Sequence, residues 1–173
     1  GVTGSIAAYK AADLASKLTQ AGALVDVILT EAAQKFVTPL TFQSVTGRRA
    51  HTDSDLWGNE AHVLHVGLGH TANLLMIAPC TANTIAKLAY GQADTLLTVT
   101  ALAATCPLLL APAMDGGMYD HPATQENLDT LRKRGAHIIE PADGRLASGL
   151  AGTGRLPETP ELIGNIRLIL GRD

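Results

Sequence analysis

Short apolar runs alternate along this chain with segments of helical spacing, and this alternation limits the folds that the chain can adopt. Residues 23–29, 73–79, 107–112 and 136–140 are apolar almost throughout, and helical patterns lie between them. Strands that are apolar on both faces are typical of parallel sheets covered by helices on each side. The sequence therefore predicts an α/β fold with a single doubly wound, Rossmann-like or flavodoxin-like parallel sheet.

The length and composition indicate one packed domain over residues 1–173. Hydrophobic residues make up 46% of the chain and charged residues 17%, a balance that favours a sizeable core over disorder. A domain of this class normally has a strand before its first glycine loop, so we expect the native chain to extend before Gly1. A fused domain after Asp173 is also compatible with the pattern.

The charge pattern argues against several classes of partner. The net charge is −3 and no basic block occurs, which argues against nucleic acid and against an anionic membrane surface. The apolar runs reach about ten residues, too few to cross a bilayer. Cys80 and Cys106 lack metal-ligand spacing, so we expect no metal site and a reducing, cytoplasmic compartment.

The first loop of the chain combines two glycines with a serine directly before a helical segment. Gly1 and Gly4 permit a tight turn, and Ser5 can cap the helix. The free N–H groups and the dipole of a helix N-terminus favour a phosphate at such a turn. The loop lacks the complete dinucleotide-binding and P-loop patterns, and a simple helix cap is the alternative interpretation.

Two more loops follow buried strands, at residues 79–83 and 112–119. Ligands of open parallel sheets bind at the carboxyl ends of the strands, so we expect these loops and the first loop to converge. An ordinary Thr/Asn helix cap and a plain turn with core methionines are the alternatives. Residues 48–64 are polar and irregular. Residues 142–157 are rich in glycine and predict a mobile loop that closes over a ligand, or else a solvated connector.

Seven segments, in this order, resemble one family, the homo-oligomeric flavin-containing cysteine decarboxylases. Each segment is weakly specific alone, whereas their order along essentially the whole chain is specific. The matching segments are residues 4–10, 30–33, 36–40, 65–68, 78–83, 112–114 and 152–158.

The resemblance implies FMN as the cofactor, with the flavin phosphate at the first loop and the ribityl-phosphate portion at residues 81–83. It implies a homotrimer or a dodecamer with FMN between subunits, and a possible fused phosphopantothenate–cysteine ligase domain. The implied cofactor contacts are Gly4, Ser5, Ile6, Thr30, Phe36, Thr81, Ala82, Asn83 and Thr98.

The resemblance also implies a carboxy-lyase that converts 4′-phospho-N-pantothenoylcysteine to 4′-phosphopantetheine in coenzyme A biosynthesis. His65 matches the active-site histidine of the family, and an imidazole can take a thiol proton near neutral pH. Met114, Asp115 and Arg155 are the implied substrate contacts. We expect Arg155 to meet the negative charge of the substrate.

Two residues depart from the family pattern. Asp115 stands where the family usually has asparagine, and an ionised carboxylate cannot donate to a substrate carboxylate. Ser148 stands where the family often has an acidic cysteine. These departures keep open an oxidative peptide-cysteine decarboxylase and a non-catalytic, FMN-binding regulatory flavoprotein, whereas His65 argues against a flavin prenyltransferase.

The other five histidines have no counterpart in the family pattern. His51, His62 and His70 lie in polar stretches and are predicted to be solvated. His121 is interpreted as a turn residue, and His137 as a buried side chain of a strand.

Overall fold

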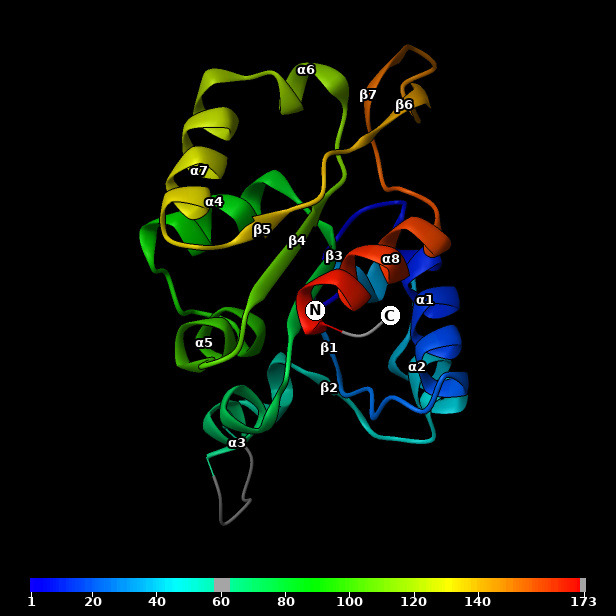
Figure 1. Cartoon of the computed structure of the whole chain (residues 1–173), viewed down its shortest axis with the longest axis vertical. Coiled ribbons are helices and arrows are strands. Elements are labelled where there is room, and N and C mark those ends of the chain that lie inside the picture. The colour runs from blue at the N-terminus through cyan, green and yellow to red at the C-terminus, as the bar shows by residue number, and fades with distance from the viewer. Residues whose placement is uncertain (58–62, 172–173) are drawn as a thin grey trace.

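In the computed structural model, which describes residues 1–57 and 63–171, parallel strands lie between two layers of helices (Figure 1). This arrangement confirms the predicted α/β class. The parallel strands are β1 (Val27–Leu29), β2 (Ala50–Thr52), β3 (Leu75–Cys80), β4 (Leu108–Pro112) and β5 (His137–Ile138). One layer holds α1 (Ala8–Gln20), α2 (Pro39–Thr46) and α8 (Thr159–Leu170). The other holds α3 (Leu64–Thr71), α4 (Ala82–Tyr90), α5 (Leu96–Ala103) and α7 (Pro122–Lys133).

The two faces of β4 explain why its sequence is apolar throughout. Leu109 and Ala111 pack in one cluster with Leu162 of α8. Leu110, between them, packs in another cluster with Leu128 of α7. Successive side chains of a strand point to opposite faces, so a strand covered on both sides needs apolar residues at every position.

The sheet is divided into two parallel parts. β1 pairs with β2, while β3, β4 and β5 form a separate three-stranded sheet. The first two residues of the chain connect the parts: Val2 N donates to Ile28 O at 2.8 Å, and Ala78 N donates to Gly1 O at 2.9 Å. The sequence predicts a single sheet. In the structure, the two parts of the sheet are joined only through Gly1 and Val2, near the carboxyl ends of β1 and β3.

An apolar cavity of about 620 Å³ continues from Gly1 between β1 and β3. Leu14 of α1 and Ile166 of α8 line one side of it. The α-amine of Gly1 donates to Met76 O at 2.7 Å, and burial lowers the pKa of this amine to about 5. This cavity separates β1 from β3.

Residues 142–157 differ from the predicted mobile loop, because they form the antiparallel strands β6 (Ala142–Arg145) and β7 (Ala151–Arg155). Glycine weakens a strand in general, but Gly144 and Gly152 pair directly in this hairpin. Residues 48–64 also contain more structure than expected. Besides β2 they include the 3₁₀ turn η2 (Asp53–Asp55) and the start of α3. The short helices η1 (Ala33–Lys35) and α6 (Gly116–Tyr119) complete the described elements.

Two histidine predictions are wrong. His51 is only 9% exposed, since it lies in β2 and pairs with β1, and its Nδ1 has no partner among residues 1–57 and 63–171. His137 is exposed, because β5 is a two-residue strand at the sheet edge. His62 lies outside the described residues.

Candidate functional site

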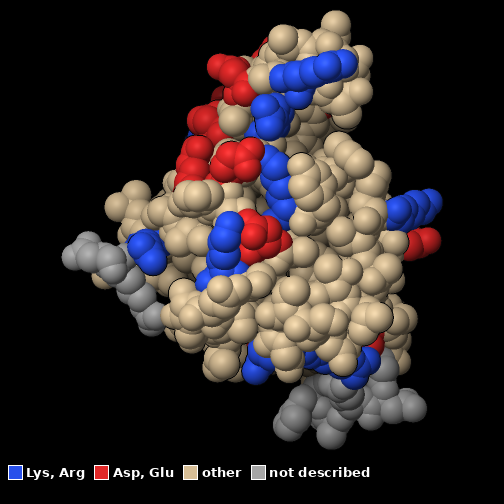
Figure 2. Space-filling view, turned by 90° about the vertical axis from the view of Figure 1, so that its right-hand side faces the viewer, with Lys and Arg blue, Asp and Glu red and all other residues tan. Residues whose placement is uncertain are grey.

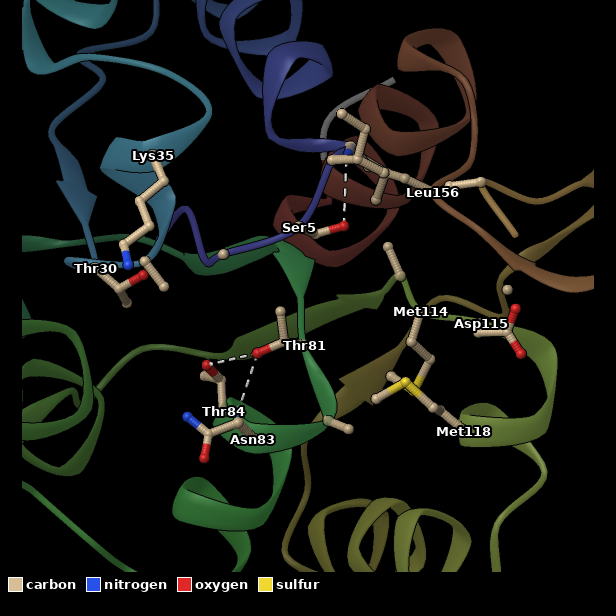
Figure 3. Close-up of a pocket in the computed structure, with 18 of the residues that line it drawn as sticks. Ser5, Thr30, Lys35, Thr81, Asn83, Thr84, Met114, Asp115, Met118 and Leu156 are labelled. Atoms are coloured by element: carbon tan, nitrogen blue, oxygen red, sulfur yellow. Dashed lines mark hydrogen bonds between the residues drawn. The ribbon is translucent and has the colours of Figure 1, made fainter. Parts of the chain in front are cut away.

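A cavity of about 1130 Å³ lies at the carboxyl ends of β3 and β4, where the three loops singled out in the sequence meet (Figure 3). Two predicted site residues, Phe36 and His65, do not line it in a single chain. The predicted site residues that line the cavity are Gly4, Ser5, Ile6, Thr30, Thr81, Ala82, Asn83, Thr98, Met114, Asp115, Ser148 and Arg155.

The first loop reaches the cavity through a turn that requires glycine. A Cβ atom on Gly4 would lie 2.4 Å from the Cβ of Ala32. Ser5 Oγ accepts from Ala7 N at 3.2 Å and so satisfies one N–H group at the start of α1. The N–H groups of Gly4 and Ile6 have no partner within the described part of the chain.

The first turn of α4 presents a second set of donors. Thr81 caps this helix, since its Oγ1 accepts from Thr84 N at 3.3 Å. The N–H groups of Ala82 and Asn83 have no partner in the described ranges. The side chain of Asn83 also lines the cavity (Figure 3). Two helix N-termini thus offer backbone donors to one space, an arrangement that favours an anion.

Thr3, which the sequence analysis did not single out, joins these two turns. Its buried hydroxyl donates to Pro79 O at 2.7 Å and accepts from Thr81 N at 3.0 Å. The partners lie more than 70 positions away in the chain. A threonine between Gly1 and Gly4 of the first loop was the signal available for this role.

Threonines and one aspartate shape the wall beside η1 and α5. Thr30 Oγ1 accepts from Ala33 N at 3.2 Å, and Thr98 is buried in the first turn of α5. Asp53 lines the cavity as well, although no sequence motif pointed to it. Its carboxylate accepts from Leu96 N at 2.8 Å and so stabilises the N-terminus of α5.

The opposite wall combines two methionines with a carboxylate. Met114 and Met118 lie close together in the cavity, with Asp115 beside them (Figure 3). Asp115 caps α6 by accepting from Gly117 N at 3.1 Å. Ser148 Oγ donates to the other carboxylate oxygen at 2.7 Å, and this bond is the main cause that lowers the pKa of Asp115.

Basic side chains line the cavity from several elements, and only Arg155 among them was predicted from the sequence as a ligand contact. Most have an acidic neighbour: Lys10 bonds Glu158 at 2.6 Å, and Lys87 bonds Asp94 at 2.7 Å. Figure 2 likewise shows basic and acidic side chains close together on one face of the molecule. The basic residues that line the cavity are Lys10, Lys35, Lys87, Arg145 and Arg155.

Phe36 and His65 lie on the surface of a single chain. Phe36 is 48% exposed and directly follows η1. His65 is half-buried in α3, which lies at the opposite end of the molecule from α6 (Figure 1). One copy of the chain therefore does not bring the histidine to the cavity.

Residues 1–57 and 63–171 lack the features of two other classes of site. No helix in these ranges has the length and apolarity to cross a membrane. The same ranges contain no group of three or more His, Cys, Asp or Glu side chains placed to hold a metal ion.

The sequence model of the Flavoprotein family matches residues 1–170. The chain is 49% identical over 162 residues to the coenzyme A biosynthesis bifunctional protein CoaBC of Bacillus subtilis (strain 168). The match covers 94% of this chain and 40% of that protein, so the chain spans about two fifths of this curated relative.

Solved structures of similar fold include a cysteine-to-serine mutant of PPC decarboxylase complexed with pantothenoylaminoethenethiol. It has a TM-score of 0.87 and 35% identity, and the match covers 96% of this chain and 93% of that one. The FMN-dependent cysteine decarboxylase SpaF has a TM-score of 0.83 and 33% identity, over 99% and 94% of the two chains.

Proposed function

Because the chain belongs to the Flavoprotein family, we propose that it binds FMN and decarboxylates 4′-phospho-N-pantothenoylcysteine to 4′-phosphopantetheine in coenzyme A biosynthesis. The observation that carries this proposal is the pair of helix N-termini at one cavity, with unpartnered N–H groups at Gly4, Ile6, Ala82 and Asn83 among the described residues. Such groups bind phosphate without further charge. The similarity to CoaBC and to PPC decarboxylase supports the same activity.

The residues of the cavity fit FMN. Its volume of about 1130 Å³ leaves room for a second ligand beside the flavin. Gly4 has no side chain and lies directly beside Ala32, so the backbone of this turn stays accessible to a phosphate. FMN bound here would supply reversible hydride transfer for the cysteine-derived part of the substrate, a redox capacity that protein side chains lack. The residues proposed to hold FMN are Gly4, Ser5, Ile6, Thr30, Phe36, Thr81, Ala82, Asn83 and Thr98.

The substrate carries a phosphate and a carboxylate, and Arg155 is the proposed contact for its negative charge. Arg155 lines the cavity, and its guanidinium lies 3.6 Å from the carboxylate of Glu158. This pair is longer than the other ion pairs of the cavity, so a ligand anion can compete for Arg155. Met114 supplies an apolar surface beside it.

His65 is the proposed base for the substrate thiol. Since it does not line the cavity of its own chain, we propose that a second copy brings it there. A trimer, alone or gathered into a dodecamer, with FMN between subunits would do this. Exposed Ile6, Tyr9 and Phe36 near the cavity supply apolar surface for such a contact.

The presence of serine at position 148 favours a second candidate function. In this function the protein is an oxidative peptide-cysteine decarboxylase whose reaction stops at an enethiol. A serine hydroxyl is a much weaker acid than a thiol, and this hydroxyl donates to Asp115. Return of the hydride needs a proton at the neighbouring carbon, and Ser148 is a poor source of it.

Incubation with 4′-phospho-N-pantothenoylcysteine tests both candidates. We expect yellow protein that yields 4′-phosphopantetheine by mass spectrometry and regains its flavin colour after turnover. An enethiol product with permanently bleached flavin identifies the oxidative alternative. Bound FMN with intact substrate identifies a non-catalytic flavoprotein. A colourless preparation that FMN cannot reconstitute contradicts the flavin assignment.

We further propose that this domain is the flavoprotein part of a longer chain. A strand before Gly1 would fill the 620 Å³ cavity between β1 and β3. A fused phosphopantothenate–cysteine ligase domain would account for the remaining length of the CoaBC relative. The free thiols Cys80 and Cys106 support a cytoplasmic location.

A further inference from the structure

Among the residues that the structure describes, one side-chain hydrogen bond ties the tip of the β6–β7 hairpin to the corner between β4 and α6. Ser148 Oγ donates to Asp115 Oδ2 at 2.7 Å. At the base of the hairpin, Met114 N donates to Gly154 O at 3.0 Å. The hairpin thus has a backbone anchor at its base and a side-chain anchor at its tip.

The turn between β6 and β7 is otherwise held by its own backbone. Leu146 N donates to Leu150 O at 2.8 Å, and Gly149 N donates to Leu146 O at 2.9 Å. Leu150 is 65% exposed, and Ser148 and Gly149 are exposed as well. Little apolar burial fixes these three residues, so the bond to Asp115 largely determines where the tip lies.

Asp115 is a fixed acceptor. Its Oδ1 accepts from Gly117 N at 3.1 Å, and its peptide oxygen accepts from Met118 N and Tyr119 N, both at 3.0 Å. Its Oδ2 is engaged by Ser148. An ionised carboxylate has no proton to donate, so Asp115 cannot bind an acidic ligand as an asparagine would.

We propose that Asp115 is a positioning residue whose carboxylate holds Ser148, and with it the cavity wall formed by residues 145–148. This proposal depends on the proposed function in one respect, namely which ligand occupies the cavity. With its proton engaged by Asp115, Ser148 presents oxygen lone pairs to the cavity. Ser148 therefore accepts a hydrogen bond from a ligand N–H or S–H group, and Asp115 acts through Ser148 rather than on the substrate.

Trypsin cleavage after Arg145, followed by mass spectrometry on flavin-free protein, tests this role. Arg145 is exposed and ends β6, next to the tip. Ser148→Ala and Asp115→Ala each remove the bond, and we expect each to raise the cleavage rate about threefold or more. Asp115→Asn keeps one acceptor oxygen for Gly117 N and places an amide N–H donor toward Ser148 Oγ, so the two side chains still bond and the cleavage rate stays near that of the wild type. The double alanine variant cleaves no faster than either single variant, because both remove one interaction.

Thr153→Ala supplies the matched control within the same hairpin. Thr153 Oγ1 donates to Asp143 at 2.5 Å, away from the tip. If this variant accelerates cleavage as much as Ser148→Ala, the hairpin opens as a whole and the proposal is wrong. Unchanged cleavage in Ser148→Ala, or additive effects in the double variant, would also overturn it.

A ligand readout separates the positioning role from general loss of structure. We expect Ser148→Ala and Asp115→Ala to release bound FMN faster than the wild type, as followed by flavin fluorescence, and Asp115→Asn to restore the slow rate. Identical release from all four proteins would show that this wall does not control access. The trypsin result stands without any flavin, so a failure of the proposed function leaves it interpretable.

Discussion

The carbonyl oxygen of Met114 faces the α-carbon of Gly154 so closely that a Cβ atom there would lie 2.1 Å from the oxygen. The Gly154 carbonyl in turn accepts from Met114 N at 3.0 Å. Two backbones meet here with no side chain between them. This contact anchors the base of the hairpin that forms one wall of the cavity.

Gly154→Ala is expected to destabilise the protein. The added methyl group must separate the two backbones, at a cost of about 1–3 kcal/mol in the free energy of unfolding. Urea unfolding measures this change. Gly164→Ala is the control, because a Cβ atom on Gly164, in α8, meets nothing within 4 Å. It should stabilise the protein by roughly 0.5–1 kcal/mol, as alanine does in a helix. Equal effects of the two substitutions would contradict the close contact.

Thr3→Val is expected to weaken both stability and FMN binding. Valine keeps the shape but leaves Pro79 O and Thr81 N without the hydroxyl, at a cost of about 1–3 kcal/mol. Urea unfolding and FMN titration measure the two effects. Thr71→Val removes an exposed hydroxyl that donates to Gly67 O, and should change neither quantity appreciably. Unaltered FMN affinity in Thr3→Val would show that the two turns need no common link.

Arg155→Ala is expected to raise the KM for the phosphorylated, carboxylated substrate with a smaller effect on kcat, because it removes a cation that contacts substrate charge. Steady-state kinetics measure both constants. Arg167→Ala, in the last turn of α8, removes a cation outside the cavity and serves as the control. A change confined to kcat would place Arg155 in the reaction rather than in binding.

His65→Asn is expected to retain FMN but to lose turnover, because the substrate thiol keeps its proton. If His65 serves the cavity of a neighbouring copy, co-assembly of this variant with an Asn83→Ala variant, expected to lose FMN from its own site, should restore part of the activity. Product formation by the mixed and the separate proteins measures this complementation. A mixture that stays inactive, or a monomer of 18.0 kDa that retains FMN, would contradict the shared site.

A chain that begins at Gly1 should become more stable between pH 5 and pH 8 through its α-amine. The unfolded amine has a pKa near 8, whereas burial lowers it to about 5 in the folded chain. In this window the unfolded state binds the proton and the folded state does not, so unfolding free energy increases by about 1.4 kcal/mol per pH unit. The contribution levels off above pH 8 and below pH 5.

A chain extended before Gly1 by six β-forming residues is the comparison for this effect. A peptide N–H then replaces the amine at Met76 O, so the slope from Gly1 disappears, while the titrating side chains of the two chains are the same. The extension should also stabilise the protein by filling the cavity between β1 and β3. If the unfolding free energies of the two chains change with pH in the same way, the Gly1 amine does not cause the pH dependence.

The fold class was predictable because burial on both faces requires apolar strands, as Leu109 and Leu110 show on opposite sides of β4. The convergence of the three loops followed from parallel topology. The hairpin at 142–157 was not predictable, because its glycines are selected by close contacts such as that of Gly154 with Met114. The positions of Thr3 and His65 depend on partners or surfaces distant in the chain, which local patterns do not encode.

The hydroxyl of Thr3 connects the loop before α1 to the end of β3 and the N-cap of α4, although the two helices cover opposite faces of the sheet. An anion held between the two turns would therefore contact both helical layers at once. Loss of that anion would loosen both layers in the same step. Protein saturated with FMN should accordingly melt in one sharp calorimetric transition, and flavin-free protein in a broader one at lower temperature.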